Sequence, residues 1–326
     1  MKNKDTIKLP DISVPLDIQY YNIGLSNEFM YSLSTLFNPN FLYFSRYIDI
    51  SNLEAITFAS ENYYENAINS IDRGVPVIDR ITPSENGAAM TLTLKRNSDI
   101  KCHIIFNVQH WTKNIDNLLT NYTLSIIAHE MAHVEITKNL YNYKKDICFP
   151  KLFNSFKQGK GFEISKLSIE EFGACKKSYR IDKENISLKI FESLLIEQLN
   201  NININQMIFV NEFKDELNNN IDYYEACFNY AKKSYENYGR LFIISSYYLG
   251  SKENSIECHV DIQNYELFKY IKELLILLNE AYKNYPSWED SSFSNIQNLL
   301  EEILINEAKI NFRTNIVGTD YFTVDL

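Results

Sequence analysis

Residues 126–136 have the sequence IIAHEMAHVEI, and this stretch decides both the fold and the chemistry expected of the chain. No Pro or Gly interrupts residues 124–136, so the stretch predicts a helix. His129 and His133 are four residues apart and therefore share one face of that helix, where both imidazoles can bind one metal ion. Glu130 lies about 100° further round and can polarise a water on that ion. The pattern indicates a hydrolytic zinc site.

A buried helix whose two histidines hydrogen-bond within the core is the alternative interpretation. That arrangement leaves several buried polar groups that each need a partner, so the metal site is favoured. Asn121 is the expected N-cap of this helix.

Composition narrows the class of protein. The 326 residues are 45% hydrophobic and 23% charged, which is typical of a globular chain of one large domain or two ordinary ones. A net charge of −10 argues against binding of nucleic acid through a basic surface. The five cysteines form no C-x-x-C pair, so neither a disulfide framework nor a cysteine zinc site is indicated.

The N-terminal region shows no signal-peptide pattern, and no run approaches the roughly 18 apolar residues of a membrane span. We therefore expect a protein that is cytoplasmic, or one that is exported without a cleaved leader, as a secreted effector or toxin would be.

The first half of the chain mixes helices with one clear β signal. Residues 1–25 predict an extended arm, and helices are expected over 26–37, ending at Asn38-Pro39, and over 53–71. Alternation over 89–95 and a second apolar run over 102–108 predict an antiparallel hairpin. This hairpin either has an open edge to which an extended peptide can add or is an ordinary internal hairpin.

The second half is strongly helical. Residues 158–161 predict a glycine-bearing loop, and Ser168 with Glu171 resembles a capping box that opens a helix. Further helices are expected over 186–199, 221–249, 261–282 and 293–310, before a strand-like tail over 312–326. The expected fold class is α+β and mainly helical, with a catalytic domain and its N-terminal arm over 1–185 and a helical domain over 186–326.

The H-E-x-x-H motif resembles that of the zincin metallopeptidases. The metzincin branch continues with a Gly and a His, and Ile136 and Asn139 occupy those positions, which excludes it. The gluzincin branch takes a Glu from a second helix within E-x-x-A, and residues 171–174, EFGA, look like that element. The resemblance covers roughly residues 120–180. It implies a zincin-like core and Zn²⁺ held by His129, His133 and Glu171, with Glu130 as general base.

The chain departs from the gluzincin pattern at Cys175, where many members have an Asp that orients the first histidine. Glu170 remains an alternative third ligand, with Asp146 and Glu163 as weaker ones. Each of these acids is otherwise an ordinary surface carboxylate.

A further donor must stabilise the oxyanion formed during hydrolysis. The candidates are His259, which has Asp261 nearby, and Tyr179, eight residues after Glu171. His259 is the expected second catalytic residue.

The expected function is that of a zinc-dependent endopeptidase acting on a protein or peptide substrate. A non-catalytic interaction protein that keeps a zincin-like core is the alternative, although Glu130 has no use in a purely structural site. Another zinc hydrolase, such as a deformylase or amidase, ranks last because the motifs of peptide deformylases are absent.

Overall fold

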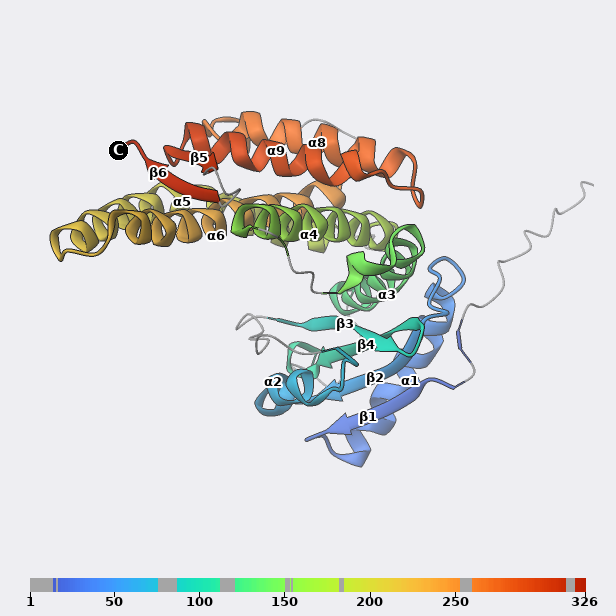
Figure 1. Cartoon of the computed structure of the whole chain (residues 1–326). Coiled ribbons are helices and arrows are strands. Elements are labelled where there is room, and N and C mark those ends of the chain that lie inside the picture. The colour runs from blue at the N-terminus through green and yellow to red at the C-terminus, as the bar shows by residue number, and fades with distance from the viewer. Residues whose placement is uncertain are drawn as a thin grey trace, which may run out of the picture. The chain divides into compact units, whose positions relative to one another are not determined.

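The computed structural model describes residues 14–15, 17–75, 87–111, 121–149, 153, 155–181, 185–252, 260–314 and 320–326 (Figure 1). The chain forms two compact units, Met1–Phe149 with Lys177–Ile186, and Pro150–Lys176 with Ser187–Leu326. The predicted class, α+β and mainly helical, is confirmed. The division predicted between residues 185 and 186 stays a prediction.

The first unit contains a four-stranded mixed sheet in the order β1-β2-β4-β3. Its strands are β1 (Gln19–Ile23), β2 (Leu53–Ala59), β3 (Ala89–Arg96) and β4 (Asp99–Asn107). The strand β2 is parallel to both β1 and β4, whereas β3 is antiparallel to β4. The predicted hairpin is therefore confirmed, and β3 is an edge strand of this sheet.

The helix predicted over residues 53–71 is wrong in its first half. The strand β2 occupies 53–59, and only the following segment is helical, as α2 (Glu61–Ser70). Six of the seven residues of β2 are buried because the strand lies inside the sheet. A strand covered on both faces loses its polar alternation, so its sequence does not show a period of two. The extended arm likewise contains a strand, β1, that pairs with β2.

The predicted end of the first helix at Asn38-Pro39 is also wrong, because α1 runs over Asn27–Phe44 with Pro39 inside it. Proline in a helix interior costs about 3 kcal/mol. Leu33, Phe37, Phe41 and Phe44 are buried along one face of α1. Burial of large apolar side chains contributes roughly 1.5–3 kcal/mol for each, enough to offset the proline.

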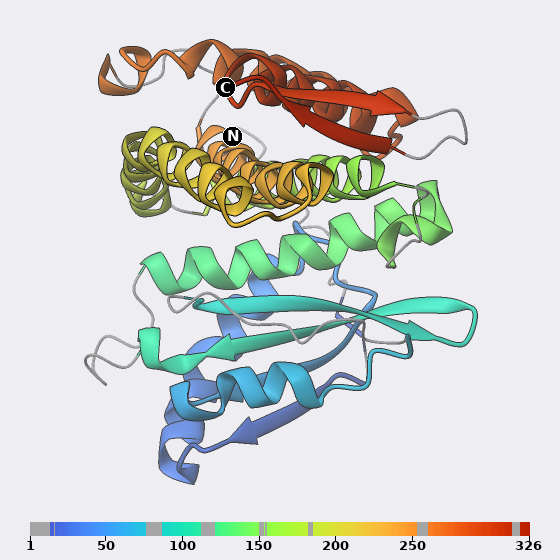
Figure 2. The ribbon, with the colours of Figure 1, turned by 60° about the vertical axis from the view of Figure 1, so that its left-hand side comes forward.

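Helices cover both faces of the sheet (Figure 2). On one face, Phe37 of α1 packs edge-on against Phe58 and Phe106, with ring centroids 5.1 and 5.9 Å apart. On the other face, Tyr64, Ala67 and Ile68 of α2 join a cluster with residues of β2, β3 and β4. The motif helix is α3 (Asn121–Tyr143), which lies along β3 and β4. Asn121, the expected N-cap, is itself a helical residue.

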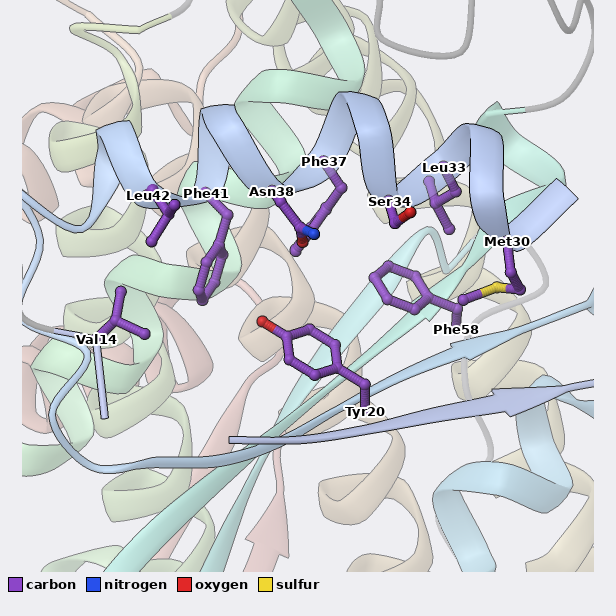
Figure 3. A pocket seen from close by; sticks show the side chains of 10 residues that line it. All are labelled: Val14, Tyr20, Met30, Leu33, Ser34, Phe37, Asn38, Phe41, Leu42 and Phe58. Carbon is purple, nitrogen blue, oxygen red and sulfur yellow. The ribbon is translucent and has the colours of Figure 1, made fainter. Parts of the chain in front are cut away.

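A pocket of about 300 Å³ opens between α1 and β1 (Figure 3). Its walls are mostly apolar, and Tyr20, Ser34 and Asn38 supply the polar side chains. The remaining lining residues are Val14, Met30, Leu33, Phe37, Phe41, Leu42 and Phe58.

His103 is a buried histidine of β4, with 5% of its surface exposed. Its Nε2 lies 2.7 Å from the hydroxyl of Thr57, and its ring stacks on Tyr21. Burial lowers the pKa of His103 to about 4, and the nearby Glu54 only partly opposes this effect. The imidazole is therefore neutral in the folded protein at neutral pH.

We expect this histidine to make the fold sensitive to acid. Between pH 6.5 and 4, His103 is protonated in the unfolded chain and neutral in the folded chain. The free energy of unfolding therefore decreases as the pH falls through this window. The difference amounts to about 3 kcal/mol. Urea unfolding of wild type and His103→Gln at pH 7.5 and 4.5 measures it. The wild type should lose about 2–3 kcal/mol more than the variant, and equal losses would contradict the expectation.

The second unit is mostly helical. Its elements are α4 (Phe156–Ser178), α5 (Ile186–Asn218), α6 (Tyr223–Gly250), α7 (Val260–Gln263), α8 (Phe268–Lys283), α9 (Asp290–Asn306), β5 (Ile310–Thr314) and β6 (Asp320–Val324). The strands β5 and β6 form an antiparallel hairpin, which confirms the strand-like tail. The tail packs through Phe322 against Phe156.

Several local predictions for this unit are wrong. The single helix expected over 261–282 is divided into α7 and α8, with residues 264–267 outside both. Residues 158–161 are helical rather than a loop, and Ser168 lies inside α4 rather than at its start. Gly161 permits the close approach of α9, since a Cβ there would lie 2.6 Å from Gln297. Ser168 is fully buried. Packing against neighbouring helices thus overrides the local signals for a loop and a cap.

No helix in the described ranges combines the length and apolar character required to traverse a bilayer.

Candidate metal centre

The helix α3 places the two histidines of the motif on one face. Its side chains at Ile127, Ala128, Met131 and Ala132 are buried, which fixes the helix within its unit. The Nε2 atoms of His129 and His133 lie 3.1 Å apart, and the two rings meet edge to face. The separation of four residues therefore brings both imidazoles to one point, as predicted.

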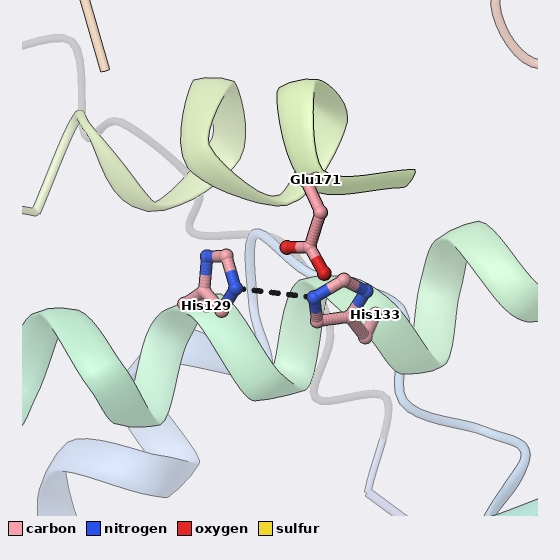
Figure 4. Close-up of side chains that lie close together, drawn as sticks. All are labelled: His129, His133 and Glu171. Atoms are coloured by element: carbon pink, nitrogen blue, oxygen red, sulfur yellow. Dashed lines mark hydrogen bonds between the residues drawn. The ribbon is translucent and has the colours of Figure 1, made fainter. Parts of the chain in front are cut away.

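Glu171 of α4 completes a group of three potential metal ligands (Figure 4). One ligand atom from each of His129, His133 and Glu171 lies within 4.8 Å of the others. Among the described residues this is the only such group of three His, Cys, Asp or Glu side chains.

The donor set fits a divalent ion such as Zn²⁺. Zinc bound at about 2.0–2.1 Å in a tetrahedron separates its ligand atoms by roughly 3.4 Å, close to the 3.1 Å between the two imidazole nitrogens. Two imidazoles and one carboxylate leave a fourth position for water, as catalytic zinc sites do. The group is a possible metal-binding triad; the identity of its metal remains a prediction.

The other acids considered as third ligands do not belong to this group. The carboxylate of Glu170 is buried and lies 3.5 Å from the ammonium group of Lys166. Glu163 pairs with Lys160 at the surface, and Asp146 is exposed.

Glu130, the expected general base, is 6% exposed, and a residue of the sheet hydrogen-bonds its carboxylate. The hydroxyl of Thr91 on β3 lies 2.7 Å from Oε2 of Glu130 and 3.1 Å from its backbone oxygen. Burial and the nearby Glu130 carboxylate raise the pKa of Tyr64, so this phenol remains protonated. Sequence reasoning missed Thr91, since only the strand register places it opposite Glu130, 39 residues later.

A second interaction that the sequence did not reveal anchors α3 two residues after His133. Glu135 accepts a hydrogen bond from the backbone N–H of Asp49 at 2.9 Å and pairs with Lys177 at 2.8 Å. Lys138, one turn further on, pairs with the Asp49 carboxylate at 2.7 Å. Burial would raise the pKa of Asp49, but the hydrogen bonds from Lys138 and Ser51 outweigh burial and lower it. These contacts fix the end of α3 that carries His133.

The two candidates for the oxyanion donor stay predictions. His259 lies outside the described residues. Tyr179 is half-buried in the turn that follows α4. Cys175 is buried, so the position at which the gluzincin pattern has an Asp carries a thiol and no carboxylate.

No family model, curated protein or solved structure matches this chain. The possible metal-binding triad combines an H-E-x-x-H motif with a Glu from a second helix. This combination is consistent with the resemblance to the zincins that the sequence shows.

Proposed function

We propose that this protein is a zinc-dependent peptidase of the gluzincin type that hydrolyses internal peptide bonds. The observation that carries the proposal is the group formed by His129, His133 and Glu171, with Glu130 next to the first histidine in the same helix. The buried carboxylate of Glu130 has an evident use beside an open metal site, as a base.

In the proposed reaction, His129, His133 and Glu171 hold the ion. Zinc, when bound, supplies a Lewis acid that lowers the pKa of a bound water towards about 7. Glu130 accepts a proton from the attacking water while a new C–O bond forms at the peptide carbonyl. Glu130 then delivers that proton to the amide nitrogen as the C–N bond breaks, and the second proton of the water passes from the new carboxylic acid to the amine. The products are a carboxylate and an ammonium ion.

The edge strand β3 is the proposed docking site for an extended substrate. The two-residue turn pairs Arg96 with Asp99, and even-numbered residues of β3 exchange backbone hydrogen bonds with β4. The backbone groups of Thr91 and Thr93 therefore point away from β4. At the end of this edge, the backbone N–H of Lys95 donates to Arg73. An extended peptide can add to the stretch before Lys95 by backbone pairing.

Metal analysis combined with cleavage of a peptide library tests the proposed function. We expect purified protein to contain one zinc per chain. His129→Ala and His133→Ala should each bind zinc at least about 100-fold more weakly than the wild type. A proteome-derived peptide library should acquire new termini with the wild type, and none after chelation. Readdition of zinc should restore cleavage.

Absence of stoichiometric zinc would overturn the proposal. Zinc that is bound without any cleavage, with a protein side chain in its fourth position, would favour the alternative of a non-catalytic interaction protein. New products formed only from formylated or non-peptide amides would favour another zinc hydrolase.

A further inference from the structure

Thr91 lies at the point where the sheet edge meets the expected general base. Its hydroxyl oxygen is 2.7 Å from Oε2 of Glu130, a short hydrogen bond to a carboxylate. The same hydroxyl lies 3.1 Å from the backbone oxygen of Glu130. Since Glu130 is buried, this donor restricts where its carboxylate can point.

The backbone of Thr91 faces a different direction from its side chain. Thr91 opposes Ile104 of β4 in the ladder, and its position in the hairpin directs its N–H and C=O away from β4, towards the edge that no described strand covers. Two bonds confirm this phase of the ladder: Asn107 N–H donates to Ala88, on the paired side, and Lys95 N–H donates outward to Arg73. One residue thus presents backbone groups to an extended peptide while its side chain holds Glu130.

We propose that Thr91 is a positioning residue that sets the general base in register with a substrate strand docked on β3. The inference rests on the proposed peptidase function and adds to it a residue that the H-E-x-x-H motif does not contain. Pairing of a peptide with the backbone of Thr91 fixes the peptide along β3. The hydroxyl of the same residue fixes the carboxylate of Glu130, so the distance between base and peptide carbonyl is set through one residue. Positioning of this kind is worth large factors in rate.

Thr91→Val tests the inference because valine keeps the shape of threonine and removes the hydroxyl. We expect kcat on the library-derived peptide to fall about tenfold, with KM and zinc content within twofold of the wild type. Thr91→Ser, which restores a hydroxyl, should recover most of kcat. Thr35→Val is the control: it also removes a threonine hydroxyl that donates to a backbone oxygen, that of Tyr31 at 3.0 Å on α1, which takes no part in the proposed reaction. This control should leave kcat unchanged.

A measurement on metal-free protein tests the contact without catalysis. The double variant Thr91→Val, Glu130→Ala should lower Tm by less than the sum of the two single variants. Each single change already breaks the same hydrogen bond between Thr91 and Glu130. Strict additivity would overturn the inference.

The kinetic outcomes separate the inference from the proposed function. If the wild type cleaves and Thr91→Val cleaves equally well, the inference is wrong and the peptidase proposal stands. If Thr35→Val is as damaging as Thr91→Val, the hydroxyl bond to Glu130 is not the cause and the inference is again wrong. If the wild type does not cleave at all, the proposed function fails and the inference fails with it.

Discussion

Glu130→Gln is expected to lower kcat by about 10²–10⁴-fold while zinc binding stays unchanged. Glutamine has nearly the same shape as glutamate and can still accept the hydrogen bond from Thr91, so the fold is kept. It cannot take a proton from water at neutral pH, so the base is removed and the ligands remain. Single-turnover cleavage of a library-derived peptide, together with zinc content of the same sample, measures the effect.

Glu135→Gln is the control for this experiment. It makes the same chemical change five residues later on α3, at a carboxylate that binds Asp49 and Lys177 rather than facing the proposed reaction. We expect some loss of stability and at most a modest loss of kcat. Retention of full activity in Glu130→Gln would contradict the mechanism, and loss of zinc in that variant would show that Glu130 is a ligand rather than a base.

The second large effect is expected at the third ligand. Glu171→Gln should weaken zinc binding by at least about 100-fold, since changes outside the ligand shell already cost 10–100-fold. Glu170→Gln should leave zinc affinity nearly unchanged, because Glu170 lies outside the three-residue group. Competition with a fluorescent zinc chelator at fixed pH gives all the affinities on one scale.

Glu163→Gln provides the control on the same helix, as this carboxylate is exposed and pairs with Lys160. The ligand assignment would be reversed if Glu170→Gln lost zinc and Glu171→Gln kept it. Equal affinity in all three variants would mean that neither glutamate binds the ion.

The parts of the site that are local in sequence could be predicted. The face shared by His129 and His133 follows from helix geometry, and the hairpin of β3 and β4 follows from alternation and a polar turn. The contact between Thr91 and Glu130 depends on strand register and on how α3 lies along the sheet. A local sequence pattern predicts neither of these.

The errors have physical causes as well. The strand β2 has buried residues on both faces, so its apolar run fits a helix as well as a strand. In α1, burial of Phe37, Phe41 and Phe44 outweighs the tendency of Pro39 to end a helix. This burial is a tertiary effect, which single-residue propensities do not include. In α4, Gly161 and Gly173 mark close packing against α9 and α8 rather than a turn.

The outer edge of β3, with which no strand in the described part of the chain pairs, also carries a risk for the protein. Backbone groups that accept one extended strand accept another regardless of which chain supplies it. Under the proposal, a second copy with a frayed strand would therefore compete with substrate for the same edge. Lys95 places a positive charge at one end of β3, where the neighbouring Arg96 pairs with Glu54. The backbone oxygen of Arg73 accepts the hydrogen bond from the outward N–H of Lys95. These features limit the length of edge available for self-association to a few residues. On the proposed function, such a short edge would be long enough to bind a peptide transiently and too short to favour a lasting sheet between molecules.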